Sequence, residues 1–194
     1  MTEHVQSVKE TRRARNIGVP LALAIIIAAA AHAQPQPAGE YQIKSAFLFN
    51  FAKFVEWPAQ LLPRGDSPMI IGVLGDDPFG NDLDDVINNK TVNGRPIVIK
   101  RYASAAEIQL CHILFISTSE RKDVPMILHT LDGTGVLTVS EIEQFTQLGG
   151  AVRFYLADAK VRFEINVDEA DREHIRVSSK LLKLATIIRE QKRE

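Results

Sequence analysis

Two neighbouring carboxylates, Asp76 and Asp77, follow an apolar run at Met69–Leu74, and Phe79 comes shortly after them. An apolar run of this length predicts a buried strand, and open α/β sheets bind ligands beyond the carboxyl ends of their strands. Asp76, Asp77 and Phe79 are therefore candidates for contacting a ligand or a partner. The simplest structural role of Asp77 is to cap a helix in which Pro78 is the first residue.

The composition of this loop argues against two nucleotide-dependent functions. The loop has neither the Walker-A nor the GxGxxG spacing, and two adjacent carboxylates repel a phosphate. Receiver domains that accept a phosphoryl group also carry an acidic pair after the first strand, but they need an Asp after the third strand and a Lys late in the sheet. The third predicted strand ends in Ile116-Ser117, so the site residues of a receiver domain are missing.

A second set of polar side chains lies along the predicted strand Lys160–Val167. Arg162, Glu164 and Asn166 alternate with apolar residues, so they share one face of the strand. Three aligned polar side chains can converge on a ligand or partner, and Glu164→Ala is expected to weaken binding with little change in melting temperature. The alternatives are a solvated face or a surface ion pair between Arg162 and Glu164, worth only about 0–1 kcal/mol.

The other reactive residue types show no catalytic or metal-binding spacing. His112, His129 and His174 form neither an HxxxH nor an HExxH pattern, and the chain has no GxSxG elbow. Cys111 is the single cysteine, so it cannot form an internal disulfide. Its place at the edge of an apolar strand predicts a buried, inert thiol. The residues themselves therefore predict no catalysis, no metal and no cofactor.

Apolar strands alternate with helices through most of the chain. This pattern predicts an α/β fold with a mainly parallel sheet flanked by helices on both faces. The predicted strands are Met69–Leu74, Ile97–Arg101, His112–Ile116 and Val136–Val139. The predicted helices run from Asp77 to about Asn88, from a capping box at Ser104 and Glu107, from Asp123 to Gly133, and from a second capping box at Ser140 and Glu143 to Gly149.

The two ends of this region depart from the alternation. Strands at Ala151–Leu156 and Lys160–Val167 are separated by a tight polar turn, which predicts an antiparallel hairpin at one edge of the sheet. The final helix is expected to start near Ser178, and its apolar stripe is Leu181, Leu184, Ala185 and Ile188. Before the first strand, a helix ending at Pro58 is expected to pack in the core, because Ile43, Phe47, Phe51 and Phe54 recur at helical spacing.

The N-terminus has the three parts of a cleavable secretory signal. Arg12, Arg13 and Arg15 precede the apolar stretch 17–31, and Ala31-His32-Ala33 is a small-x-small cleavage site. The apolar stretch is shorter than the ~20 residues that span a bilayer. We therefore expect residues 1–33 to be removed and residues 34–194 to form a single exported domain. The net charge of −1 and the lack of a basic stripe give no support to nucleic-acid binding.

Several segments, in order along nearly the whole exported chain, resemble the YfiR-like family of periplasmic proteins. They are EYQIKSAFLFNFAKFVEWP, IIGVLGDDPFG, VNGRPIVIKR, CHILFIS, the Gly149-Gly150 turn, VRFEINVD and IRVSSKLLKLA. The resemblance implies a mainly parallel sheet flanked by helices. It also implies a dimeric periplasmic repressor that binds the sensor domain of an inner-membrane diguanylate cyclase, lowers cyclic di-GMP and thereby restrains biofilm growth.

Two other functions compete with this one. One is a periplasmic sensor or carrier of a small ligand that serves a sensor kinase or an outer-membrane receptor. The other is an enzyme.

The cysteines of this chain depart from the family pattern, because the repressors of the family carry two cysteine pairs. Cys111 matches one member of a pair, its partner is expected near Ile71, and the pair expected around Gly149-Gly150 is missing. Redox control therefore does not carry over to this chain.

Overall fold

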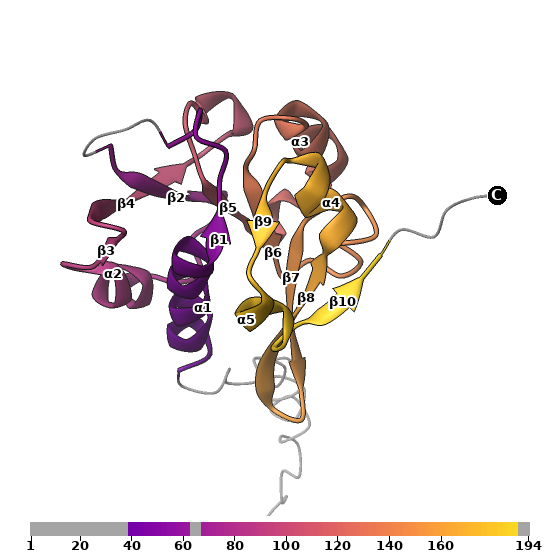
Figure 1. Cartoon of the computed structure of the whole chain (residues 1–194). Helices are drawn as coiled ribbons and strands as arrows, with labels where there is room; N and C mark the ends of the chain where they lie inside the picture. The colour runs from indigo at the N-terminus through magenta and orange to yellow at the C-terminus, as the bar shows by residue number, and fades with distance from the viewer. Residues whose placement is uncertain (1–38, 63–66, 190–194) are drawn as a thin grey trace, which may run out of the picture. The chain divides into compact units, whose positions relative to one another are not determined.

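Three apolar runs form the centre of a mainly parallel sheet in the computed structural model, which describes residues 39–62 and 67–189. They are β2 (Met69–Leu74), β5 (Ile113–Ile116) and β6 (Leu137–Ser140), and all of their residues are buried. Burial on both faces is typical of parallel strands covered by helices on each side. The predicted α/β fold is thereby confirmed (Figure 1). The predicted signal peptide lies outside the described residues.

The main sheet has the strand order β10-β8-β7-β6-β5-β2-β4-β3. Its outer strands are β3 (Thr91–Val92) and β4 (Arg95–Tyr102) on one side, and β7 (Val152–Ala157), β8 (Lys160–Asn166) and β10 (Thr186–Ile188) on the other. The strands from β4 to β7 pair in parallel, whereas β3–β4 and β7–β8 are antiparallel. A small second sheet pairs β1 (Val55–Glu56) with β9 (Arg176–Val177).

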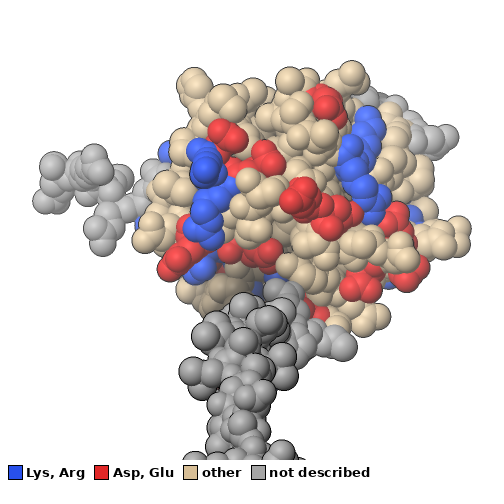
Figure 2. All heavy atoms as spheres, turned by 180° about the vertical axis from the view of Figure 1, so that it is seen from behind, with Lys and Arg blue, Asp and Glu red and all other residues tan. Residues whose placement is uncertain are grey.

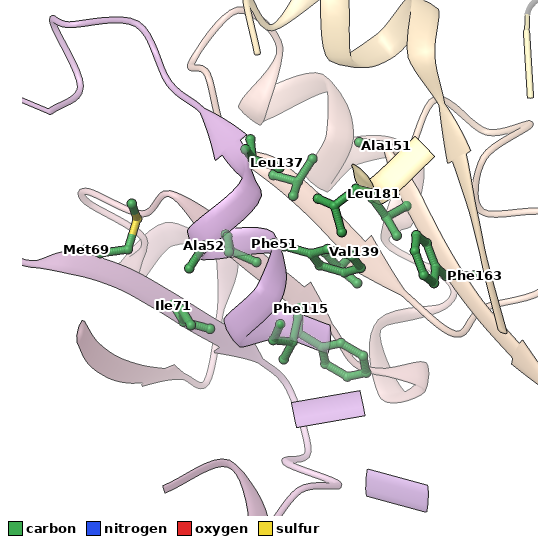
Figure 3. Packing of buried hydrophobic residues seen from close by; sticks show 14 of the residues in the cluster. Phe51, Ala52, Met69, Ile71, Phe115, Leu137, Val139, Ala151, Phe163 and Leu181 are labelled. Atoms are coloured by element: carbon green, nitrogen blue, oxygen red, sulfur yellow. The ribbon is translucent and has the colours of Figure 1, made fainter. Parts of the chain in front are cut away.

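Two hydrophobic clusters lie on opposite faces of the main sheet. The first cluster includes residues of α1 (Glu40–Phe54), α2 (Asn81–Ile87), α4 (Val167–Arg172) and α5 (Ser179–Leu182). Figure 3 shows Phe51 of α1 in this cluster with Phe115, Val139 and Phe163 of the sheet. The second cluster includes residues of α3 (Val124–Leu131). No helix within residues 39–62 and 67–189 is long and apolar enough to cross a bilayer.

The hairpin of β7 and β8 forms as predicted, but it does not lie at the edge of the sheet. Asp158 and Ala159 join its strands with φ of 52° and 56°, which suits a type I′ turn. The final helix ends at Leu182, and Thr186–Ile188 form β10, which pairs in parallel with β8. This pairing satisfies backbone groups that β8 would otherwise expose at the edge, and it outweighs the local helical pattern.

The helix predicted between Ser140 and Gly149 is wrong, because that segment consists of turns. Ser140 Oγ donates a hydrogen bond to the carbonyl of Ile116 at 2.7 Å, so this side chain joins two strands. Gln144 has a φ of 62°, which is incompatible with a continuing right-handed helix. The other capping box, at Ser104, begins only the 3₁₀ turn η2 (Ala105–Glu107).

Candidate functional site

The loops after β2 and β5 meet at the carboxyl edge of the sheet, where the strand order reverses direction. From β2 the chain passes to β4 on one side of β2, and it then returns to β5 on the other side. Asp76 N–H donates to Ser119 Oγ at 3.1 Å, which joins the two loops. Gly75 makes this approach possible, since a Cβ there would lie 2.3 Å from Ser119 Oγ. Ligands of open α/β sheets bind at such a switch point.

Asp77 orders the loop after β2, but it does not cap the following helix. Its Oδ1 accepts from Phe79 N–H at 2.8 Å, and α2 begins later, with Gly80 as the capping residue. Its Oδ2 accepts from Arg101 Nε at 2.6 Å, while Arg101 Nη2 donates to Asp84 at 2.5 Å. Hydrogen bonds to Asp84 and Asp77 raise the pKa of Arg101. The helix cap predicted for Asp77 is therefore wrong, and Asp77 anchors an arginine instead.

Phe79 closes the loop against the core and is only 3% exposed. Its ring lies edge-on to Phe115 at 4.7 Å and to Tyr41 of α1 at 5.5 Å between centroids. The neighbouring Asp76 side chain is exposed. Of the candidates in this loop, Asp76 is therefore the one open to a partner, whereas Asp77 and Phe79 fix the shape of the loop.

A charged cluster in the first turn of α1 was not anticipated from the sequence. Lys44 is 2% exposed and forms ion pairs with Glu40 Oε1 at 2.5 Å and with Glu141, the residue after β6. Tyr41 Oη donates to Glu141 Oε1 at 3.0 Å. Among the described residues, nothing donates a hydrogen bond to Glu40 Oε2. The spacing of Glu40 and Lys44, four residues apart, was a signal for this pair.

The second predicted group lies on β8, and only part of it is accessible. Glu164 is 6% exposed, whereas Arg162 is exposed. Glu164 Oε1 accepts from Arg153 Nε at 2.8 Å and from Thr146 Oγ1 at 2.5 Å. Burial alone raises the pKa of Glu164, but the hydrogen bonds from Arg153 and Thr146 outweigh it, so the pKa falls below its ordinary value. Glu164 therefore pairs with Arg153 of β7 and not with Arg162.

Asn166 belongs to the same hydrogen-bond network as Glu164. Its Oδ1 accepts from Glu169 N–H at 3.1 Å, which caps α4, and its Nδ2 donates to the carbonyl of Thr146 at 3.1 Å. Thr146 thus connects Asn166 with Glu164, while Arg162 lies outside this network. Because β7 runs parallel to β6, the tip of the β7–β8 hairpin points to the same carboxyl edge as the loop at Asp76.

The cysteine is buried, and the His, Asp and Glu side chains do not gather into a metal site in the described residues. Burial raises the pKa of Cys111 to about 12, and its thiol donates to the carbonyl of Ile113 at 2.8 Å. Residues 39–62 and 67–189 contain no group of three His, Cys, Asp or Glu side chains suited to a metal ion. Figure 2 shows two short groups of basic side chains on one face of the molecule, each with acidic side chains beside it.

Comparison with known proteins gives a family and a fold. The model of a protein family described as YfiR/HmsC-like matches residues 41–186. A crystal structure of a conserved domain protein from Vibrio cholerae O1 biovar El Tor strain N16961 superposes with a TM-score of 0.51 and 9% sequence identity. The match covers 77% of this chain and 60% of that chain. At this identity, the likeness shows a shared fold.

Proposed function

Because this chain belongs to the YfiR/HmsC-like family, we propose that it represses a membrane-bound diguanylate cyclase from the periplasm. It binds the periplasmic sensor domain of the cyclase, lowers cyclic di-GMP and has no catalytic activity of its own. The observation that carries this proposal is the family match over residues 41–186, which spans the elements from α1 to the start of β10. As in the repressors of this family, we propose a homodimer.

The mechanism that fits these properties is differential binding. A binding protein shifts a two-state partner only by the difference between its affinities for the two states. The repressor therefore binds the inactive state of the sensor domain more tightly than the active state. A tenfold higher affinity for the inactive state corresponds to a difference of about 1.4 kcal/mol in binding free energy. The paired charges of Asp77 with Arg101 and of Glu164 with Arg153 support a rigid binding surface better than they support proton transfer.

Asp76 and Arg162 are the proposed contacts with the partner at the carboxyl edge of the sheet. They are the two exposed members of the candidate set. The other four candidates, Asp77, Phe79, Glu164 and Asn166, are buried or partly buried and are held by hydrogen bonds or ring contacts with neighbouring residues. Their proposed role is to shape the surface. Losing a charge from the rim of an interface chiefly changes the rate of association.

The test measures cyclic di-GMP in cells that carry the cognate cyclase and either the wild type, Asp76→Ala or Arg162→Ala. Both variants should raise cyclic di-GMP while the purified proteins keep their melting temperatures. The matched control is His129→Ala, an exposed residue in the last turn of α3, which should behave like the wild type. A pulldown from solubilised membranes identifies the partner directly.

Three outcomes would overturn parts of the proposal. If cyclic di-GMP is unchanged after deletion of the whole gene, the protein is not a repressor of the cyclase. Capture of a sensor kinase or an outer-membrane receptor in place of a cyclase supports the alternative of a ligand sensor or carrier. If deletion raises cyclic di-GMP but neither Asp76→Ala nor Arg162→Ala does, the contact lies elsewhere on the molecule.

A further inference from the structure

The strand β4 has a free edge along most of its length. On one side it pairs in parallel with β2 from Ile97 to Tyr102. On the other side, β3 pairs only with its first two residues, Arg95 and Pro96. In the described part of the chain, no strand lies beyond β4 from Ile97 onward. The opposite edge of the sheet, β10, has only three residues (Figure 1), so β4 offers the longer template for pairing with another chain.

Two observations show which backbone groups of β4 point outward. The carbonyl of Tyr102 accepts from Gly75 N–H at 3.0 Å, so the backbone groups of Tyr102 face β2. Arg95 and Val92 flank the two-residue turn of the β3–β4 hairpin, so the backbone groups of Arg95 face β3. Because backbone groups of successive residues in a strand point to alternate sides, both observations give the same assignment. The residues that present N–H and C=O at the free edge are Ile97, Ile99 and Arg101.

A second copy of β4 fits this edge in antiparallel orientation. With a twofold axis at Ile99, Ile99 pairs with its own copy, and Ile97 pairs with Arg101 of the second chain. Each of these pairs exchanges two hydrogen bonds, so the junction forms about six of them. Val98 then lies opposite Lys100 of the second chain. The axis therefore brings two isoleucines together and sets each basic side chain of the junction against an apolar residue.

The charges of β4 favour this axis over its neighbours. An axis at Val98 would place Arg101 opposite Arg95, on a side of Arg95 that β3 already occupies. An axis at Lys100 would place Lys100 opposite itself. Like charges directly opposite each other destabilise a pair of strands. Pro96 does not obstruct the pairing, because its backbone belongs to the alternate set that faces β2, and its missing N–H costs the free edge no donor.

We propose that two copies of this chain join through the free edges of β4, with the twofold axis at Ile99, into one continuous sheet. This inference rests on the homodimer of the proposed function and names its interface. None of the residues 97–101 is buried, and Val98 is 39% exposed. Their outward backbone groups and the complementary order of their charges carry the inference. Because the two copies of β4 are antiparallel, the carboxyl edges of the two sheets face in opposite directions.

The first test is the mass of the exported protein by sedimentation velocity between about 1 and 100 μM, where a concentration-dependent dimer is expected. Ile99→Pro removes the N–H groups that meet at the axis, and edge strands tolerate proline where the N–H faces away from the sheet. Its dimer should dissociate at least about tenfold more readily than that of the wild type, with unchanged far-UV circular dichroism. The control is Ile99→Ala, which loses the same side chain but keeps the N–H, so its dimer should be tighter than that of Ile99→Pro.

Disulfide trapping tests the position of the axis. Residues paired across it have Cα atoms about 5.5 Å apart, which a disulfide spans, so Ile99→Cys should form a covalent dimer after mild oxidation. Val98→Cys is the control, because its two copies would be displaced by about 7 Å along the strands. Ile99→Cys should crosslink at least about tenfold faster, although exposure alone predicts the reverse, since Val98 is more exposed than Ile99. The wild type should not crosslink, because Cys111 is buried.

The interface is overturned if Ile99→Cys crosslinks no faster than Val98→Cys, or if Ile99→Pro dimerises as tightly as Ile99→Ala. Either result with a dimeric wild type keeps the homodimer and places its interface elsewhere. A wild type that stays monomeric at about 100 μM overturns the homodimer and this interface together, whereas repression is still decided by cyclic di-GMP. Should Ile99→Cys fail to fold, Val98→Cys is mixed with Lys100→Cys. The mixed disulfide should then form faster than either symmetric one, and equal rates would overturn the interface.

Discussion

Glu164 lies on β8 with its carboxylate between Arg153 and Thr146. Glu164→Ala should lower the free energy of unfolding, because the arginine loses its partner and the threonine hydroxyl loses its acceptor. Breaking a fully buried pair costs about 3–5 kcal/mol. The Arg153 side chain is 21% exposed, so solvent screening reduces the expected loss to about 1–3 kcal/mol. Urea denaturation measures this loss, and Arg162→Ala on the same strand is the exposed control.

The Arg153 pair also predicts how stability depends on pH. The pKa of Glu164 is lower in the folded protein than its ordinary value of 4.5. Its contribution is therefore complete above about pH 4.5 and is lost as the pH falls through the folded pKa. Glu164→Gln should remove this part of the acid dependence. Equal losses of stability in wild type and Glu164→Gln between about pH 5 and pH 3 would contradict the pairing.

Gly72 marks where a disulfide partner for Cys111 would have to stand. An ideal Cβ on Gly72 lies 2.9 Å from Cys111 Sγ, close to the roughly 3 Å that separates these atoms in a disulfide. The same Cβ would lie 2.8 Å from Leu114 Cδ1 and from Tyr102 Cε2, so these two side chains must shift to admit it. With that shift, Gly72→Cys should form an intramolecular disulfide after mild oxidation, detected as a loss of free thiols. Melting temperature should then depend on reductant in the variant and be independent of it in the wild type, where Cys111 is free.

The matched control for this disulfide is Ile71→Cys, at the position expected from the family pattern. Ile71 belongs to the hydrophobic cluster on the α1 face of the sheet, whereas Cys111 belongs to the cluster on the opposite face. Adjacent residues of a strand point to opposite faces. Ile71→Cys should keep both thiols free under the same oxidation, and a disulfide in this variant but not in Gly72→Cys would show that the register of β2 is wrong.

Candidate residues were recognisable from the sequence by type, but their partners were not. The loop after β2 could be located because an apolar run precedes Asp76 and Asp77. The arginine that pairs with Asp77 lies on β4, and the arginine that pairs with Glu164 lies on β7. Such pairs depend on strand order and register, which a local pattern does not contain. For the same reason, the link from Lys44 to Glu141 was missed.

At the scale of the element, α1 gives a direct test of the core. Phe51 is fully buried, and its ring packs against Phe154 at 5.8 Å and against Phe163 at 5.3 Å. Phe51→Ala should destabilise the protein by about 3–5 kcal/mol, since it leaves a cavity among aromatic rings. The control on the same helix is Ile43→Ala, because Ile43 is 48% exposed, and it should cost less than about 1 kcal/mol. Equal losses in urea denaturation would mean that α1 is packed differently.

The central strands were predictable, whereas the segment after Ser140 and the length of the final helix were not. The predicted strand Met69–Leu74 has the same bounds as β2. Its continuous apolar character and the turn residues that flank it both indicate a buried strand at this place. In the segment after Ser140, the capping box is present, but its serine bonds to Ile116 across the sheet. In the last segment, the predicted helix starts as expected after Ser178, but it ends at Leu182, and pairing of β10 with β8 takes the residues that were expected to continue it. In both segments, a tertiary contact satisfies backbone groups better than a longer local helix does.

At the scale of the whole molecule, topology gathers the candidate residues that the sequence left apart. The loop after β2, the first turn of α1, the residue after β6 and the tip of the β7–β8 hairpin all belong to the carboxyl edge of the sheet. The loop that carries Asp76 and the hairpin that carries Arg162, separated by most of the domain in sequence, therefore lie along the same edge of the sheet. This common edge is the basis for proposing both residues as contacts of one partner.

Export is the property of the whole chain on which the proposed function depends. Deletion of residues 2–33 leaves every described residue in place, so the variant should fold and unfold like the exported protein in urea denaturation. It should nevertheless fail to lower cyclic di-GMP, because the proposed partner, the sensor domain of a cyclase, would lie on the other side of the membrane. Fusion of a foreign signal peptide to Gln34 should restore repression, and intact mass of the wild-type periplasmic fraction should show a chain beginning at Gln34. Repression by the leaderless chain would place the contact in the cytoplasm and refute this view.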